Sequence, residues 1–376
     1  MKRITFNKQF MVLMFLLLSC FASYAADEDL ITKQITIKLT EAGTLPNKIA
    51  SSKKNLVTNL KIIGEINGTD LRFLREMAGS DEYGKSTFGN LSILDLSETR
   101  IVEGGYNYRI IYNGDYLITS NDTIGAYAFD DCTSLTSIKI PSGVKEIGTY
   151  AFDNCISLTS VIIQSGVKKI GRLAFNGCSY LTSINIPSSV TEIGMLAFNN
   201  CKSLTSVNIP SSVTEIGDGA FIGCSSLTTV DIPSSVKTIR SFTFYNCESL
   251  ISVKIPSSVT EIGENAFRGC NSLKSIYVYA EDVPFIYSST FGGFDSRNCT
   301  LYVPNGTSDS YSMYMYFGNF KNIVEFDATS IHNTVATPEA QETARYATNG
   351  QRLTAPINGI NLVKYSDGTV KKLFVK

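Results

Sequence analysis

Hydrophobic positions recur every 23 residues through the middle of the chain. Each unit begins with cysteine, leucine follows three residues later, and β-branched residues lie six and eight residues after the cysteine. In the first unit Ile138 and Ile140 alternate with Ser137 and Lys139, the period-two pattern of a short strand with one buried face. Pro141 then ends the strand, because proline has no amide hydrogen for a sheet ladder. The cysteines that set the period stand at 132, 155, 178, 201, 224, 247 and 270.

The second half of each unit predicts a short helical turn that closes a coil. Its apolar side chains come from Val144, Ile147, Ala151 and Phe152 and their equivalents. The residue before each cysteine is Gly, Asn or Asp, which tolerate left-handed backbone, so we expect it to end the turn. A period of about 20 to 29 residues is typical of a leucine-rich repeat, whose units bury their apolar faces only by stacking. We therefore predict a leucine-rich-repeat solenoid of 23-residue coils with short parallel strands, mostly β with short helical turns.

The flanking regions carry weaker signals. The patterns at 60–62 and 94–96 indicate two longer repeats, and a helix is predicted at 69–77. An Asp-Gly pair at 367–368 between two strand-like segments predicts a small C-terminal β-hairpin. The predicted organisation is a signal peptide (1–25), an N-terminal cap with an irregular first repeat (26–90), an irregular repeat with a tyrosine-rich insertion (91–131), six regular repeats (132–269), C-terminal repeats and cap (270–326), a linker (327–345) and a hairpin that is a candidate sorting segment (346–376).

The first residues predict export. Basic residues precede the apolar run 10–18, and the small residues Ser23 and Ala25 follow it, as in a secretory signal peptide. The sequence Leu-Leu-Ser-Cys ending at Cys20 also resembles a lipobox, in which Cys20 would be lipidated. We favour cleavage after Ala25, because acidic residues follow at once. No later stretch approaches the roughly 18 apolar residues of a membrane span, so membrane association would require lipidation.

Composition narrows the chemistry. The 33 Lys and Arg balance 34 Asp and Glu to a net charge of −1, which does not favour nucleic acid as a partner. His332 is the only histidine, so a Ser-His-Asp triad or a multi-histidine metal site is very hard to assemble. A constant spacing of 23 differs from that of disulfide frameworks or zinc sites, so we interpret the repeat cysteines as buried free thiols that act as small apolar spacers. We expect no enzymatic activity, no cofactor and no metal.

The repeat unit C-x-S-L-T-S-I-x-I-P-S-S-V-T-E-I-G-x-x-A-F-x-x resembles the BspA-like subclass of leucine-rich repeats, found in surface and secreted proteins of anaerobic Gram-negative bacteria. The resemblance implies a right-handed curved solenoid at the cell surface and a role in adhesion to host matrix proteins or other cells. It implies no catalytic residues. The tail from Asn349 to Lys372 is similar to C-terminal segments of secreted proteins from such bacteria, some of which are sorting signals.

Candidate binding residues lie outside the core. One outward strand column varies in residue type while its neighbour is uniformly Ser or Thr, and a variable column on a fixed scaffold is typical of a recognition surface. Drift of exposed positions explains the variation equally well. The column consists of Lys139, Asn185, Asn208, Asp231, Lys254 and Tyr277, with Ile162 among them. The insertion adds Tyr106, Tyr108, Tyr112 and Tyr116, because tyrosine gives contact area at low entropy cost.

These observations predict an exported, non-enzymatic protein that binds macromolecules. The expected partners are host or bacterial surface proteins, including extracellular matrix or mucin. The alternative is a glycan-binding protein for polysaccharide or mucin capture. The absence of tryptophan counts against that alternative.

Overall fold

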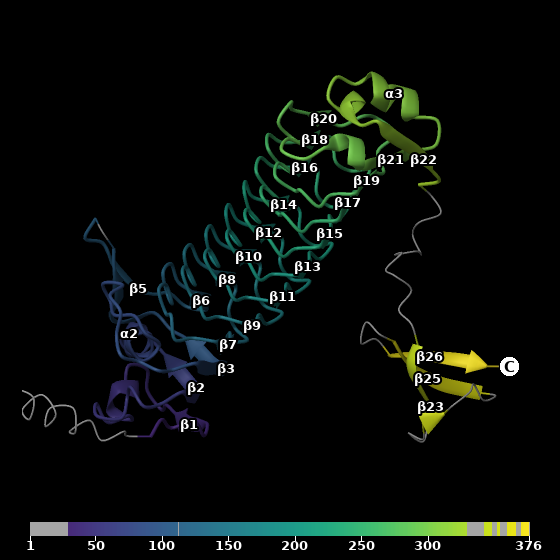
Figure 1. Cartoon of the computed structure of the whole chain (residues 1–376). Coiled ribbons are helices and arrows are strands. Elements are labelled where there is room, and N and C mark those ends of the chain that lie inside the picture. The colour runs from purple at the N-terminus through teal and green to yellow at the C-terminus, as the bar shows by residue number, and fades with distance from the viewer. Residues whose placement is uncertain are drawn as a thin grey trace, which may run out of the picture. The chain divides into compact units, whose positions relative to one another are not determined.

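Each 23-residue unit forms one coil that contributes a short strand to each of two sides of a solenoid (Figure 1). The computed structural model describes residues 29–111, 113–328, 342–347, 352–353, 359–365 and 370–375. The chain divides into two compact units, Met1–Phe326 and Asp327–Lys376. The predicted signal peptide and Cys20 lie outside the described residues. The first unit confirms the predicted leucine-rich-repeat solenoid with parallel strands.

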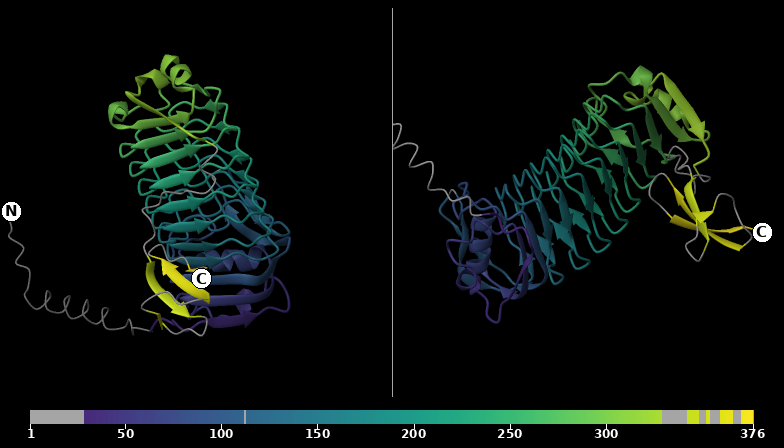
Figure 2. Two further views of the ribbon diagram at one scale, coloured as in Figure 1. Left: turned by 90° about the vertical axis from the view of Figure 1, so that its right-hand side faces the viewer. Right: turned by 60° about the horizontal axis from the view of Figure 1, so that its bottom comes forward.

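The first side of the solenoid holds the strands that contain the Leu-x-x-Ile-x-Ile pattern. Their bounds are β1 (Ile35–Lys38), β2 (Asn59–Ile66), β3 (Ile93–Ile101), β7 (Ser137–Lys139), β9 (Ser160–Ile162), β11 (Ser183–Asn185), β13 (Ser206–Asn208), β15 (Thr229–Asp231), β17 (Ser252–Ile255), β19 (Ser275–Val278), β21 (Thr300–Pro304) and β22 (Asn322–Phe326). They pair in parallel as two sheets, one from β1 to β9 and one from β11 to β22. Figure 2 shows these strands lying one above the other.

The second side holds two-residue strands of the Glu-Ile type. They are β6 (Thr123–Ile124), β8 (Glu146–Ile147), β10 (Lys169–Ile170), β12 (Glu192–Ile193), β14 (Glu215–Ile216), β16 (Thr238–Ile239), β18 (Glu261–Ile262) and β20 (Phe285–Ile286). The remaining elements of the first unit are η1 (Leu45–Asn47), α2 (Gly68–Met77), β4 (Gly104–Ile110), β5 (Tyr116–Thr119), η2 (Ser296–Asn298), α3 (Ser308–Met313) and η3 (Phe317–Asn319). The helix predicted at 69–77 is confirmed.

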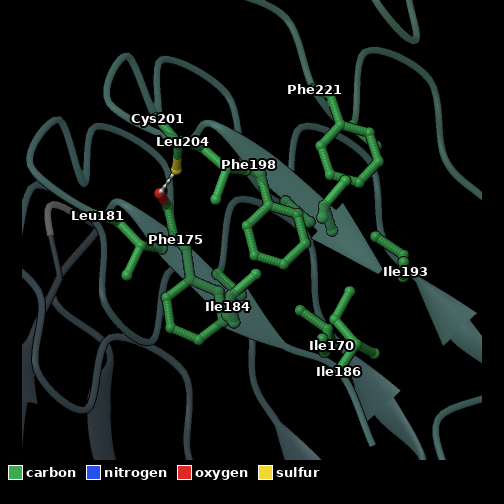
Figure 3. Packing of buried hydrophobic residues seen from close by; sticks show 14 of the residues in the cluster. Ile170, Phe175, Leu181, Ile184, Ile186, Ile193, Phe198, Cys201, Leu204 and Phe221 are labelled. Carbon is green, nitrogen blue, oxygen red and sulfur yellow. Dashed lines mark hydrogen bonds between the residues drawn. The ribbon is translucent and has the colours of Figure 1, made fainter. Parts of the chain in front are cut away.

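A ladder of phenylalanine rings fills the centre of the stack (Figure 3). From Phe129 to Phe291 successive rings lie with centroids 5.1 to 5.5 Å apart and planes within 14° of parallel. The Leu, Val and Ile side chains of both sides pack around the rings and are almost fully buried. Burying one such side chain stabilises a fold by roughly 1.5 to 3 kcal/mol. The repeated core therefore carries most of the stability of the first unit.

The repeat cysteines are buried free thiols, as predicted, but they are more than spacers. Each Sγ from Cys155 to Cys270 donates a hydrogen bond to the carbonyl oxygen of the phenylalanine 26 residues earlier, at 3.0 to 3.3 Å. Figure 3 shows this bond between Cys201 and Phe175. That carbonyl also accepts from the amide of the cysteine three residues later, for example Phe175 from Cys178 at 3.3 Å. The thiol therefore fills the second acceptor position of a buried carbonyl.

Two columns of left-handed residues shape the turn in each coil. The column directly before the cysteines has positive φ throughout, as predicted, from Asp131 (φ 56°) to Gly269 (φ 79°). A second column was not predicted, because bulky residues such as Leu196 (φ 58°) and Phe242 (φ 60°) occupy it. Left-handed backbone costs such residues about 1 to 2 kcal/mol. Their amides donate to carbonyls of the next coil, for example Leu196 to Asp218 at 3.0 Å, which offsets the cost.

A glycine column brings adjacent coils into backbone contact on the second side. A Cβ atom at Gly148, Gly171, Gly194, Gly217 or Gly263 would lie 2.4 to 2.8 Å from backbone atoms of the preceding coil. Arg240 occupies the equivalent position in the fifth repeat. Within the described residues, the amides of Lys237 and Arg240 lack the bond to the preceding coil that their equivalents make. The sheet on the second side accordingly ends at β14 and restarts at β16.

The N-terminal part continues the stack, as the patterns at 60–62 and 94–96 predicted. Leu60 of β2 pairs with Leu94 of β3, which pairs with Ile138 of β7. A buried ionic cluster fastens the cap to the first coils: Asp130 contacts Arg75 of α2 at 2.6 Å and Arg109 of β4 at 2.7 Å. These residues lie far apart in sequence, so the pairing had no local signal.

The C-terminal end of the stack is covered by aromatic residues. The last ring of the ladder, Phe291, contacts Phe317 and Phe320 around η3. Tyr311 of α3 is buried, and its hydroxyl donates to the carbonyl of Ala280 at 2.7 Å. These contacts close the core after the last coil.

Within the described residues, no helix has the length and apolar character needed to cross a membrane.

The second unit is a four-stranded antiparallel sheet, so the prediction of a two-stranded hairpin was incomplete. The hairpin strands β25 (Gly359–Tyr365) and β26 (Val370–Val375) pair as expected. However, β23 (Glu342–Ala347) pairs with β25, and β24 (Arg352–Leu353) pairs with β23. The beginning of β23 lies in the segment assigned to a linker. An isolated hairpin is marginal in water, and the two extra strands provide the pairing it lacks.

The glycine column leads to a prediction about stability. Gly194→Ala places a Cβ 2.7 Å from the amide nitrogen of Arg172, so we expect it to destabilise the protein by roughly 1 to 3 kcal/mol. Arg240→Ala is the matched control, because Arg240 already carries a Cβ and its ion pair with Glu215 is exposed; we expect less than about 0.5 kcal/mol. Denaturant unfolding measures both values. Equal effects of the two variants would contradict the close packing of the coils.

The cysteine column leads to a second prediction. Burial raises the pKa of the Cys224 thiol to about 12 and the pKa values of Cys155 and Cys201 well above the ordinary value. A buried, protonated thiol reacts slowly with disulfide reagents. The chain from residue 26 should therefore expose no reactive thiol in its native state at pH 8 and eight after unfolding, as counted with a chromogenic disulfide reagent. Fast labelling of the native protein would refute the burial of the column.

Candidate binding surfaces

The predicted binding column runs along the first side in three aligned stretches, because β9 and β11 belong to different sheets and β13 pairs with β15 only at Ser206 and Thr229. The strand registers align Lys139 with Ile162 and Asn185 with Asn208, and they align Asp231, Lys254 and Tyr277 in successive strands. The registers also extend the column beyond the regular repeats. Toward the N-terminus they add Asp95, Lys61 and Thr36, and toward the C-terminus Tyr302 and Val324. The irregular spacing of these end repeats concealed the additional members from sequence reasoning.

Four charged members of the column form two ion pairs with one another. Lys139 Nζ lies 2.9 Å from Asp95 Oδ2, and Lys254 Nζ lies 3.6 Å from Asp231 Oδ1. Burial by itself would raise the pKa of Asp95, but hydrogen bonds from Ser97 and Lys139 outweigh burial and lower that pKa to about 2. Lys139 therefore has a structural partner, and the charges of the column largely cancel along its length.

The centre of the column is uncharged and open. Ile162, Asn185 and Asn208 lie between the two ion pairs, and Ile162 is 47% exposed. Within the described residues, neither Asn185 nor Asn208 makes a side-chain hydrogen bond, whereas the amides of Asn176 and Asn199 bond at 2.6 Å in a ladder at the turn. The central amides are thus available for a ligand. Hydroxyl groups flank them at Ser160, Ser183, Ser206 and Thr229.

Aromatic residues end the column on the C-terminal side. Tyr277 stacks on Tyr302 with ring centroids 4.4 Å apart and planes 7° from parallel. Phe326 contacts Tyr277 and Tyr279 edge-on. Because stacked rings of successive coils face each other along the solenoid axis, they present edges and hydroxyl groups to solvent. Tyr277 is half-buried, and Tyr302 covers one of its ring faces.

The tyrosine-rich insertion is a hairpin of β4 and β5, and its tyrosines differ in exposure. Tyr106 and Tyr116 are 71% and 69% exposed. Tyr108 is 1% exposed, and its hydroxyl donates to the carbonyl of Ala126 at 2.8 Å. Its assignment as a binding residue was wrong: Tyr108 is buried, and its hydrogen bond to Ala126 helps to fasten the hairpin to the first coil. Strand alternation would place Tyr106 and Tyr108 on one face, but the register of β4 shifts between Gly104 and Arg109. Tyr112 lies outside the described residues.

A hollow beside Tyr106 was not predicted. Its volume is about 300 Å³, and it lies over one stripe of α2 between the hairpin and η1. The helical spacing of the stripe can be read from the sequence, but the walls come from segments about 25 to 35 residues away on either side. The lining residues are Pro46, Thr69, Arg72, Phe73, Glu76 and Tyr106.

The described residues contain no group of three or more His, Cys, Asp or Glu side chains placed to hold a metal ion. The repeat thiols are buried, and burial raises their pKa values, so they are unsuited to nucleophilic catalysis. The open sheet surface is suited to contact with a macromolecule, since it does not enclose a small molecule.

The coils, their strand registers and the repeated turn geometry define a leucine-rich repeat solenoid. The family model described as BspA type leucine rich repeat region, in six copies, matches residues 116–227 and 191–323, together more than half of the chain. The chain therefore belongs to the BspA-type leucine-rich repeat family. A comparison with curated protein sequences finds no significant match.

Solved structures of bacterial leucine-rich repeat proteins are similar to parts of this chain. A T. pallidum leucine rich repeat protein is 35% identical with a TM-score of 0.38, covering 40% of this chain and 71% of its own. A leucine-rich repeat protein from Bacteroides ovatus is 27% identical with a TM-score of 0.34, covering 60% and 68%. A leucine rich cell surface protein from Faecalibacterium prausnitzii is 25% identical with a TM-score of 0.23, covering 61% and 87%.

The Asp95–Lys139 pair leads to a prediction about pH. The pKa of Asp95 in the folded protein is about 2, below the roughly 3.9 of an unfolded chain, so its ionised form stabilises the fold above about pH 4, and this contribution is lost as the pH falls toward 2. Lys139→Ala removes one partner and should raise that pKa. We expect the variant to lose about 1 kcal/mol of unfolding free energy at pH 7 and to approach the parent near pH 2.

Denaturant unfolding at both pH values checks this expectation. Lys254→Ala is the control, because its partner Asp231 is 74% exposed and such pairs contribute little. We expect it to change the stability by less than about 0.5 kcal/mol. A Lys139→Ala effect that is the same at pH 7 and pH 2 would contradict the assigned role of the pair.

Proposed function

We propose that this protein is exported and non-enzymatic, and that it binds another protein through the first side of its solenoid. The observation that carries the proposal is the uncharged centre of the outward column, where the amides of Asn185 and Asn208 have no partner within the described residues. An open amide that faces solvent can donate and accept hydrogen bonds to the backbone of a bound protein.

The arrangement around these amides supports a protein partner. Ile162 adds an exposed apolar contact, and the hydroxyl column beside it is flat and polar. Interfaces combine apolar contacts with about one hydrogen bond per 100 to 200 Å². The ion pairs at either end of this stretch leave little net charge. The surface therefore favours partners that it recognises by shape and hydrogen bonding, and it does not favour strongly charged partners.

The glycan alternative has less support on this side of the solenoid. Sugar rings pack on open aromatic faces, and Tyr277 and Tyr302 each cover one ring face of the other. Surface exposure of the protein is supported by family membership and by the predicted signal peptide. Suitable partners are therefore host or bacterial surface proteins, including extracellular-matrix proteins and mucin. Attachment to the membrane through Cys20 remains the alternative to release of the mature chain.

A binding experiment tests the proposal. The chain from residue 26 is immobilised and exposed by surface plasmon resonance to a panel of extracellular-matrix proteins, mucin and bacterial surface proteins. For any protein that binds, Asn185→Ala with Asn208→Ala should weaken the affinity roughly tenfold, because each lost hydrogen bond costs about 0.5 to 1.5 kcal/mol.

The control variant is Thr191→Ala with Thr214→Ala. These threonines are exposed in the same two coils but on the second side of the solenoid. The control should retain the affinity of the parent. Failure of the folded chain to bind any member of the panel, or equal losses in both variants, would reject the first side as the binding surface.

A further inference from the structure

The hollow at the N-terminal end has two rigid walls. Tyr106 forms one wall, and its backbone amide donates to Thr69 Oγ1 of α2 at 3.0 Å. Gly68 allows this close approach, because a Cβ there would lie 2.1 Å from the carbonyl oxygen of Tyr106. The glycine pair before Tyr106 has positive φ, 108° at Gly104 and 75° at Gly105. The hairpin therefore holds an exposed tyrosine at a fixed position above the helix.

The opposite wall is Pro46 in η1. A buried carboxylate holds η1 against α2: Asp70 accepts hydrogen bonds from the amides of Gly43 at 2.5 Å, Leu45 at 2.9 Å and Asn67 at 3.0 Å. Asn67 caps the helix in return, since its side chain accepts from Thr69. Both walls are thus fastened to the same end of one helix, and the hollow does not depend on a mobile loop.

The floor combines apolar and charged groups. Phe73 lies beside Arg72 and Glu76, and Lys54 lies 5.7 Å from the centre of the Phe73 ring. Glu76 contacts Lys54 at 2.6 Å and Arg72 at 3.8 Å. Arg72 also pairs with Glu82. Arg72 and Glu76 therefore place one cationic and one anionic group side by side in the lining, and Lys54 and Glu82 pair with them from outside it. The floor thus presents hydrogen-bond donors and acceptors without net charge.

This arrangement selects against charged ligands. A phosphate, sulfate or carboxylate would meet Glu76, and an ammonium or guanidinium group would meet Arg72. A ligand that matches the floor is neutral and carries adjacent groups that both donate and accept hydrogen bonds. A ligand that matches the walls has an apolar face for Tyr106 and Pro46. Vicinal hydroxyl groups on a ring with an apolar C–H face meet both requirements.

We propose that this hollow binds a neutral pyranose unit of a glycan, with Tyr106 packing against the sugar ring and Arg72 and Glu76 bonding to its hydroxyl groups. The volume of about 300 Å³ lies at the lower end of the range for small-ligand sites. The site is separate from the binding column on the first side, so the protein carries two independent recognition surfaces: one for protein and one for sugar.

Saturation-transfer NMR tests the proposal on the chain from residue 26. The probes are methyl glycosides of glucose, galactose, mannose, N-acetylglucosamine and N-acetylgalactosamine, with glucuronate as an anionic comparison and a proline-rich peptide as a competing class of ligand. We expect at least one neutral glycoside to bind. Tyr106→Ala should weaken it roughly tenfold, and Tyr106→Phe, which keeps the ring, should retain most of the affinity.

Tyr116→Ala is the matched control, because Tyr116 is 69% exposed on the same hairpin but does not line the hollow. It should bind sugar like the parent, as should the variant with Asn185→Ala and Asn208→Ala, which separates this site from the binding column. Absence of binding by every neutral glycoside, binding of the peptide alone, or equal losses in Tyr106→Ala and Tyr116→Ala would overturn the proposal.

Discussion

Hydrogen bonds from one coil to the next at the phenylalanine turn are the constraint on which the rest of the structure depends. The amide of each repeat phenylalanine from Phe129 to Phe267 donates to a carbonyl in the following coil at 2.7 to 2.9 Å. This spacing stacks the rings and brings the glycine column against the preceding backbone. It also places each cysteine thiol beside the phenylalanine carbonyl of the coil before it. The turn ladder continues past Arg240, where the ladder on the second side is interrupted.

The same constraint separates scaffold from surface. Because the inward positions of every coil are committed to one packing arrangement, variation is confined to side chains that point outward. The outward column shows three kinds of outcome: ion pairs at Lys139 and Lys254, a mutual ring stack at Tyr277, and unpaired amides at Asn185 and Asn208. Only the unpaired amides of Asn185 and Asn208 can form hydrogen bonds to a partner. The N-terminal hollow arises where the regular stack ends and a helix replaces a turn.

Much of the solenoid could be predicted because its determinants are local and repeated. Strand position followed from the alternation at Ile138 and Ile140, and the left-handed residue before each cysteine followed from the restriction to Gly, Asn and Asp. The second left-handed column could not be predicted, since Leu196 and Phe242 have no intrinsic preference for that conformation. Their backbone is held by hydrogen bonds to the next coil. The number of strands in the second unit was missed because β23 lies in a segment with the composition of a linker.

The sequence by itself determined the period, the core residues and the choice of a repeat scaffold, because a 23-residue pattern of apolar side chains can bury its faces only by stacking. Tertiary structure alone decided which of the residues outside the repeat core are accessible to a ligand. Tyr106 and Tyr108 are two residues apart, yet one is open beside the hollow and the other is buried against the first coil. The reason is that their surroundings come from α2, η1 and the first turn, which only the folded backbone brings together.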